Sequence, residues 1–257
     1  MRRLACLSLF AFASAAHSAD DAFTLTGGHT DFTDGYGSRT TLGIESVEKR
    51  GANTWVFGAI GGQRRYGDGT RFDGTNVSGA FSRRWNARWS SRTSAAFSTD
   101  DPVFANRFVE QDVSWRGLQD IALTAGARYS EYFGGAHAWA WHAAGAWYRD
   151  RLTVRYRYTH HDVSTLGNSH SHLLSFRVND RHAGGHTQLW LGTGTSLHEY
   201  DWQPIVQPGD YRSIALRRVQ PLGRGVALNL DVDQAWYDTP VADYRGTGLR
   251  AGFTWRW

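Results

Sequence analysis

The chain has 257 residues, with 28 basic and 24 acidic side chains and one cysteine. This small positive excess gives no reason to expect nucleic-acid binding. The mean hydropathy of −0.49, without a long apolar run beyond the amino terminus, excludes membrane-spanning helices. A soluble all-β sandwich and a membrane β-barrel remain.

The amino terminus predicts a secretory signal peptide over residues 1–19. Two arginines precede an apolar run, and small residues follow that run. This is the order of the three regions of a cleaved export signal, with cleavage expected between Ala16 and Ala19. Cys6 would leave with the peptide, so we expect residues 20–257 to form one domain without a disulfide.

The remaining chain reads as strands in order. Segments of about ten residues alternate apolar with small or polar side chains, as strands facing lipid do. The clearest segment, 226–236, places valines and leucines on one face and Asp231 and Asp233 on the other. The same alternation appears over 121–129 and 152–159.

The connections alternate between short turns and longer loops, as in outer-membrane barrels. The short turns are expected at 49–53, 86–87, 116–119, 149–150, 179–185 and 222–225. The longer loops are expected at 33–38, 66–74, 99–106, 133–136, 161–170, 199–210 and 238–243. These connections predict an all-β, antiparallel transmembrane barrel of 14 strands, or of 12 if two weak strands merge. The loops are too short to predict a large plug inside it.

Aromatic residues predict two belts at the membrane interfaces. One set flanks the short turns: Trp55, Trp85, Trp89, Trp115 and Trp147. The other flanks the long loops: Tyr66, Tyr132, Trp139, Tyr158, Trp202, Trp236 and Tyr244. The last strand also alternates and ends on Phe253, Trp255 and Trp257, which we expect the outer-membrane assembly machinery to recognise.

A series of short motifs along the chain resembles the YaiO family of outer-membrane proteins. The motifs are Asp31-Phe32-Thr33-Asp34, Pro102-Val103-Phe104-Ala105, Ala127-Arg128-Tyr129, Arg155-Tyr156-Arg157-Tyr158-Thr159-His160, Arg177-Val178-Asn179-Asp180, Thr187-Gln188-Leu189-Trp190-Leu191, Tyr200-Asp201-Trp202 and Trp236-Tyr237-Asp238-Thr239-Pro240. The resemblance implies an outer-membrane barrel, and it brings no catalytic residue or substrate. Some relatives join this barrel to periplasmic helical repeats, as in polysaccharide exporters.

Several groups of residues could carry chemistry. A histidine-rich loop could bind Zn²⁺ or Ni²⁺, but a solvated loop without a metal is the preferred interpretation: His160, His161, Asp162, His170 and His172. A lipid A-modifying enzyme would need a nucleophile beside a base, for which these residues are available: His137, His142, Ser164, Ser169 and Ser171. We expect His142 to be a packed interior residue, and we expect no catalytic site, metal or cofactor.

The inward register collects charged residues, as a barrel lumen should. They are Glu110, Asp112, Arg128, Arg155, Arg157, Arg177, Arg217, Asp231, Asp233 and Arg250. An arginine-rich wall with fixed carboxylates would favour anions in an open pore. The same charges could instead pair across the lumen and close it.

Aspartates recur in the long loops, where they could bind Ca²⁺ or Mg²⁺ or serve as ordinary turn residues. They are Asp34, Asp68, Asp73, Asp100, Asp101, Asp162, Asp201, Asp210, Asp238 and Asp243. Together, the sequence predicts a barrel of the Gram-negative outer membrane in contact with its lipids and lipopolysaccharide. The expected function is a narrow passive pore for small anionic solutes. A non-conducting scaffold and an accessory to polysaccharide export are the alternatives, and a lipid A-modifying enzyme is a further one.

Overall fold

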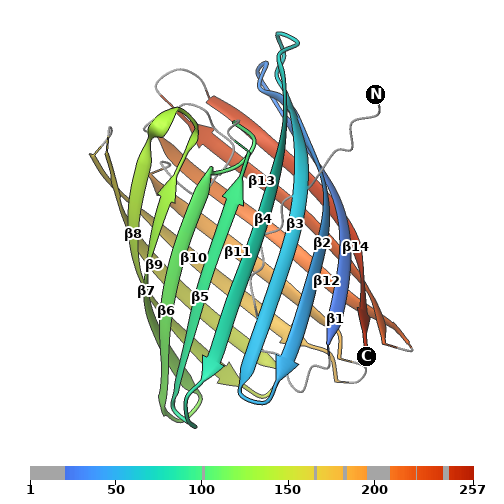
Figure 1. The fold of residues 1–257 in the computed structure, drawn as a ribbon, viewed down its shortest axis with the longest axis vertical. Coiled ribbons are helices and arrows are strands. Elements are labelled where there is room, and N and C mark those ends of the chain that lie inside the picture. The colour runs from blue at the N-terminus through green and yellow to red at the C-terminus, as the bar shows by residue number, and fades with distance from the viewer. Residues whose placement is uncertain are drawn as a thin grey trace.

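The computed structural model describes residues 21–99, 102–164, 167–181, 184–195, 209–223, 225–239 and 243–257. The predicted signal peptide lies outside these ranges. The strands, shown in Figure 1, are β1 (Ala22–Phe32), β2 (Gly37–Arg50), β3 (Asn53–Arg65), β4 (Arg71–Arg84), β5 (Trp89–Ser98), β6 (Arg107–Leu118), β7 (Ile121–Glu131), β8 (His137–Arg149), β9 (Leu152–Val163), β10 (Gly167–Asn179), β11 (His186–Thr195), β12 (Asp210–Gly223), β13 (Val226–Asp238) and β14 (Asp243–Arg256). One short 3₁₀ turn, Phe133–Gly135, precedes β8.

The strands form one closed antiparallel barrel in which each strand pairs with its sequence neighbours and β1 pairs with β14. At this seam Leu25 lies opposite Phe253, and the backbone N–H of Trp257 donates to the carbonyl of Asp21 at 3.0 Å. Closure satisfies the backbone groups that an open sheet edge would leave unpaired. The prediction of 14 strands is confirmed, and the 12-stranded alternative is wrong.

The connections fall where the alternation of short and long segments placed them, with one difference. We predicted a long loop over 161–170, but β9 continues to Val163 and β10 begins at Gly167. The ladder includes the pairs Asp162 with Asn168 and His161 with Ser169. The polar residues of this region are therefore strand residues, because the hairpin extends as a paired ladder beyond its apolar part. The predicted loop 199–210 lies mainly outside the described residues.

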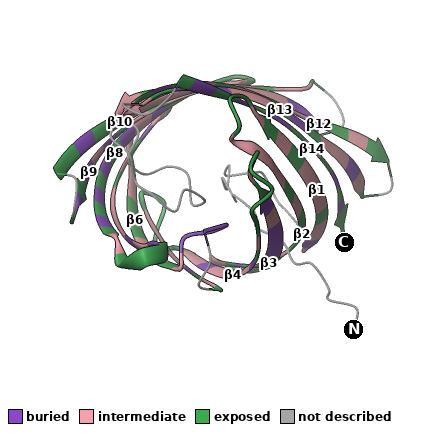
Figure 2. Cartoon of the chain, turned by 90° about the horizontal axis from the view of Figure 1, so that it is seen from above, coloured by how far each residue is buried: buried purple, intermediate pink, exposed green. Residues whose placement is uncertain are grey.

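The outer face of the barrel is apolar and the inner face is polar, the reverse of a soluble protein. Phe57, Phe97 and Leu249 point outward and are 52%, 62% and 58% exposed, whereas the inward Asp231 is 6% exposed. Seen from above, the strands enclose a ring whose exposed and buried residues alternate along each strand (Figure 2). Large apolar side chains on the outside require a lipid surface around the barrel.

One connecting segment enters the barrel instead of extending from it. Pro102–Ala105, between β5 and β6, is buried, and Val103 and Phe104 are 0% and 2% exposed. Phe104 packs with Ile60 and Phe72, while Ala105 packs with Tyr132 on another part of the wall. We did not expect a connection to fold into the barrel, because the loops are short. This segment narrows the lumen at the end that carries the longer connections.

The two predicted aromatic belts differ in outcome. The tryptophans near the short turns are outward, with Trp55, Trp89 and Trp147 each more than a third exposed. Near the long loops, however, Tyr132 and Tyr244 are buried, and Tyr244 stacks with neighbouring tyrosines inside the barrel. They are packing residues, so the second belt rests on Trp139, Tyr158 and Trp236; Trp202 lies outside the described residues.

Candidate functional site: the charged lumen

The lumen holds a cavity of about 460 Å³, lined by residues from strands around the whole barrel. Of the ten charged residues predicted to face inward, nine line this cavity: Glu110, Asp112, Arg128, Arg155, Arg157, Arg217, Asp231, Asp233 and Arg250. The tenth, Arg177, does not line it; its Nε donates to Asn179 Oδ1 at 2.9 Å, near the short turns.

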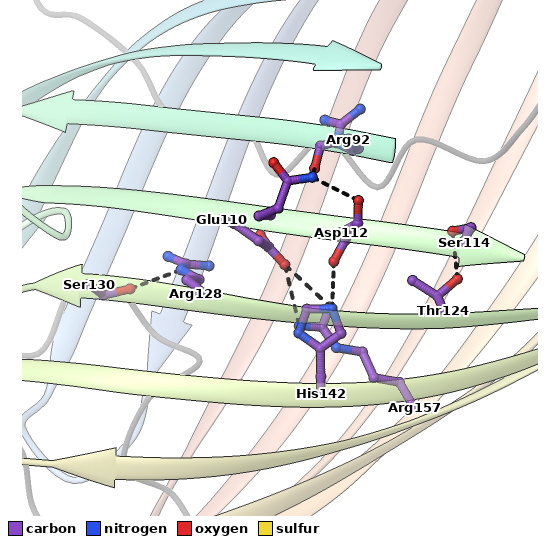
Figure 3. A network of polar contacts seen from close by, with 10 residues as sticks. Arg92, Glu110, Asp112, Ser114, Thr124, Arg128, Ser130, His142 and Arg157 are labelled. Carbon is purple, nitrogen blue, oxygen red and sulfur yellow. Dashed lines mark hydrogen bonds and ion pairs between the residues drawn. The ribbon is translucent and has the colours of Figure 1, made fainter. Parts of the chain in front are cut away.

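The most closely connected group joins β6, β8 and β9 (Figure 3). The His142 side chain is fully buried, and its Nε2 lies 2.6 Å from Asp112 Oδ1. On its other side, Arg157 Nη2 donates to His142 Nδ1 at 3.0 Å. Arg157 also lies 3.5 Å from Glu110 Oε1. Two carboxylates, an imidazole and a guanidinium therefore form one network on the lumen wall.

The network depends on a glycine in the strand between its members. Gly126 of β7 is the register partner of both Asp112 and His142. A β-carbon at this position would overlap Asp112 Oδ1 and lie 2.6 Å from His142 Nε2. Because Gly126 has no side chain, His142 reaches Asp112 across an intervening strand.

Arg157 determines the tautomer of His142. A guanidinium only donates hydrogen bonds, so Nδ1 must be the accepting nitrogen. The ring hydrogen therefore lies on Nε2 and is donated to Asp112. The arrangement orients a neutral imidazole between a cation and an anion.

These residues also form the one cluster with metal-ligand composition in the described part of the chain. One ligand atom each from Glu110, Asp112 and His142 lies within 4.8 Å of the others. A metal at His142 Nε2 would require its hydrogen on Nδ1, which Arg157 occupies as a donor. The hydrogen bonds therefore fit a charge network and do not fit a bound cation.

Two further ion pairs lie on the opposite part of the wall. Arg217 of β12 donates through Nε and Nη2 to the two oxygens of Asp231 on β13. Arg250 Nη2 of β14 lies 3.7 Å from Asp233 Oδ1. Glycine again makes room, since a β-carbon at Gly28 would lie 2.5 Å from Arg250 Cγ. Each pair joins neighbouring strands.

Arg128 packs against an aromatic ring on the lumen wall. Its guanidinium lies 4.1 Å from the centre of the Phe108 ring, and its Nε donates to Ser130 Oγ at 2.9 Å. Arg92 and Arg155 also line the cavity, and neither has a carboxylate within ion-pair distance among the described residues.

Sequence reasoning missed several charged lumen residues, namely Arg39, Glu45, Arg64 and Arg92. Small or polar residues occupy both faces of β2 and β5 around them, so alternation did not identify the inward face. Arg64 is 0% exposed and lies over the rings of Phe32 and Tyr66. Its place just before a predicted loop concealed this role.

The predicted histidine cluster is divided between the two faces of the sheet. His161 is buried and inward, with its Nε2 3.2 Å from Ser171 Oγ. His160, His170 and His172 belong to the outward register, and His172 Nδ1 is hydrogen-bonded to the Tyr156 hydroxyl at 2.7 Å. The described histidines therefore do not converge on one point outside or inside the barrel.

The residues considered for catalysis are likewise separated. Ser164 Oγ accepts a hydrogen bond from the backbone of His137 at 3.3 Å, and Ser171 contacts His161. The histidine that is hydrogen-bonded to a carboxylate is His142. Its other ring nitrogen is bonded to Arg157 and not to a serine hydroxyl. These described residues do not assemble a nucleophile, base and acid in one place.

Two of the described loop aspartates have local roles in their turns. Asp68 accepts a hydrogen bond from the backbone N–H of Thr70 at 2.8 Å, which lowers the pKa of the Asp68 carboxyl. Asp34 adopts a positive φ of 57° and bonds to Thr33. Both arrangements are those of turn residues. Asp100, Asp101 and Asp201 lie outside the described residues.

A closed antiparallel barrel with an apolar outside and a charged inside defines a membrane β-barrel. Residues 20–201 match the YaiO membrane beta barrel domain. Because this match covers well over half of the chain, the protein belongs to the YaiO family, as its motifs indicated. No helix in the described ranges is long and apolar enough to cross a membrane.

Solved barrels share this fold at low sequence identity. The CymD monoaromatic hydrocarbon channel is 8% identical with a TM-score of 0.66, the match covering 94% of this chain and 89% of that one. The Ralstonia pickettii toluene transporter TbuX is 8% identical with a TM-score of 0.62, over 94% and 90%. A bacterial polysaccharide outer membrane secretin is 9% identical with a TM-score of 0.55, over 94% and 100%.

Proposed function

We propose that this protein is a narrow passive channel of the outer membrane for small anionic solutes. The observation that carries the proposal is the composition of the cavity wall. Seven arginines and five carboxylates line the cavity, so the lumen has an excess of fixed positive charge. Fixed charges at close quarters set the preference of a pore for anions or cations.

The position of the ion pairs supports an open lumen. Arg217 with Asp231 and Arg250 with Asp233 join adjacent strands, and the network around His142 lies along β6 to β9. These contacts follow the wall and do not bridge the cavity. They hold the carboxylates in place and leave Arg92 and Arg155 facing the solute path.

A non-conducting barrel is the second candidate, and the inward segment Pro102–Ala105 favours it. Its apolar side chains pack against β3 and against the β7–β9 region, which could obstruct the lumen. An accessory role in polysaccharide export is a weaker proposal, since the likeness to a polysaccharide secretin concerns the fold.

Conductance of the refolded protein in planar bilayers tests the proposal. We expect a reversal potential that favours anions and shifts toward zero as salt rises, because the Debye length falls from about 10 Å at 0.1 M to about 3 Å at 1 M. The double variant R92Q/R155Q should lose much of this preference. Arg212, which is outward and exposed, provides the control variant R212Q. A silent native protein would support the scaffold, and a cation-selective one would contradict the role of the arginines.

A further inference from the structure

The short-turn end of the barrel carries a dense group of arginines. Three consecutive turns and the strand ends beside them carry six exposed arginines and two aspartates, which we call the basic turn patch: Arg83, Arg84, Arg88, Arg116, Asp120, Arg149, Asp150 and Arg151. None of these arginines forms an ion pair among the described residues. At the opposite end, the described residues of the connections themselves include no arginine or lysine, and the exposed arginines there, such as Arg65, Arg71 and Arg212, lie at strand ends.

Backbone hydrogen bonds hold the three turns in fixed positions relative to one another. The N–H of Arg116 donates to the carbonyl of Arg88 at 2.8 Å, and that of Tyr148 donates to Asp120 at 2.8 Å. Within the first turn, Asn86 Oδ1 accepts from the N–H groups of Arg88 and Trp89 at 2.8 and 2.9 Å. The arginines therefore project from a rigid rim.

Aromatic side chains place this patch at the level of lipid headgroups. Trp85 is 60% exposed, and the Arg83 guanidinium lies 4.5 Å from the centre of its ring. Trp89 and Trp147 are outward at the same rim, 46% and 41% exposed. Tryptophan and tyrosine prefer the boundary between hydrocarbon and water. Outward Leu118 and Leu123, more than a third exposed, continue the surface into the hydrocarbon region.

We propose that the basic turn patch binds the phosphodiester headgroups of anionic phospholipids in the leaflet that meets the short turns. Guanidinium groups match phosphate oxygens in charge and geometry, and basic residues at a membrane surface are attracted to anionic lipids. Lipid is the occupant because the patch is continuous with the apolar outer wall. The proposal does not depend on whether the lumen conducts.

Spin-label spectroscopy of the refolded barrel in phosphatidylcholine bilayers tests this binding. The motionally restricted fraction of labelled phosphatidylglycerol, relative to labelled phosphatidylcholine, gives the lipid preference. We expect a several-fold preference for phosphatidylglycerol in the native protein and a preference close to one in R83Q/R84Q/R88Q. The matched control R65Q/R212Q/R245Q removes equal charge from exposed positions at the long-loop end and should keep the native preference.

Several results would overturn the proposal. They are no preference in the native protein, an equal loss in both triple variants, or a stronger preference for labelled lipid A than for phosphatidylglycerol. Binding of an acidic peptide without any lipid preference would assign the patch to a protein partner. If the patch variant does not fold, a salt titration of the native protein still decides, since an electrostatic preference must collapse between 0.1 M and 1 M salt.

Discussion

His142 on β8 donates its Nε2 hydrogen to Asp112 on β6 across an intervening strand, over the α-carbon of Gly126. Neighbouring strands supply most side-chain contacts in a barrel, so this bond between second neighbours requires a gap in β7. We expect Gly126→Ala to separate the pair and to lower the free energy of unfolding by about 1 to 3 kcal/mol, the cost of an unsatisfied buried polar group. The added β-carbon would also lie 2.6 Å from the carbonyl oxygen of Gln111, which adds to this loss.

Urea unfolding followed by tryptophan fluorescence measures that change. Gly145→Ala on β8 is the matched control, because its β-carbon would meet only Leu123 at an ordinary 3.8 Å. An equal effect of both substitutions would contradict the role given to Gly126.

Arg217 and Asp231 should behave as a coupled pair. Asp231 is almost fully buried, so Arg217→Met leaves an uncompensated carboxylate and should destabilise the barrel by about 3 to 5 kcal/mol. The double variant R217M/D231L should recover most of this loss. A double-mutant cycle of urea unfolding measures the coupling, and additive effects would show that the two residues act independently.

The lipid-facing register predicts a dependence on membrane depth. Leu230 is outward on the central part of β13, so Leu230→Arg should cost about 2 to 4 kcal/mol. Leu222, outward at the end of β12, should tolerate the same change at about 0 to 1 kcal/mol. Unfolding in phospholipid vesicles provides both values, and the opposite order would refute the depth assigned to these leucines.

Metal removal should leave the barrel folded. Without Cys6 the chain contains no cysteine, and the hydrogen bonds of His142 do not fit a cation. The protein without residues 1–19 should therefore keep its heat-modifiable gel mobility in chelator and reductant together. Loss of the folded band with chelator alone, restored by one divalent metal, would reopen the metal assignment at Glu110 and Asp112.

A rim ion pair predicts a small dependence of stability on acid pH. Arg218 donates to both oxygens of Asp180 at 2.9 and 2.7 Å, which lowers the pKa of the Asp180 carboxyl below its ordinary value of 3.8. A carboxyl with a lowered folded-state pKa contributes stability above its unfolded value and loses it as pH falls through the folded value.

We therefore expect the urea midpoint of the native protein to fall below pH 3.8 more steeply than that of Asp180→Asn. High salt should reduce the difference, because both side chains are partly exposed to solvent. Identical pH profiles of the two proteins would show that Asp180 does not contribute to the loss of stability in acid.

The strands of this barrel could be predicted because period-two alternation and turn residues are local properties. The hairpin around 161–170 was wrongly predicted as a loop, because Asp162 and Asn168, which pair with each other across the strands, are both polar. A strand that continues past its apolar part has no reason to remain hydrophobic, so composition marks its end too early.

The lumen contacts could be predicted less well than the faces. Alternation along the strands correctly predicted that Asp112 and His142 face inward. Their contact, however, depends on the strand register, which places these residues, 30 positions apart in the sequence, on either side of Gly126. The inward fold of Val103 and Phe104 depends on partners in β3 and β4, and such distant packing leaves no periodic signal in a short segment.

The seam between β1 and β14 is one more strand pair, with the N–H of Trp257 donating to Asp21. Since residues 21 and 257 meet there, a short linker could join them. The chain could then be opened at the turn between Leu118 and Ile121, on the same rim. Such a circular permutation would retain every described strand pair, so strand order around the ring, and not the position of the chain break, defines this barrel.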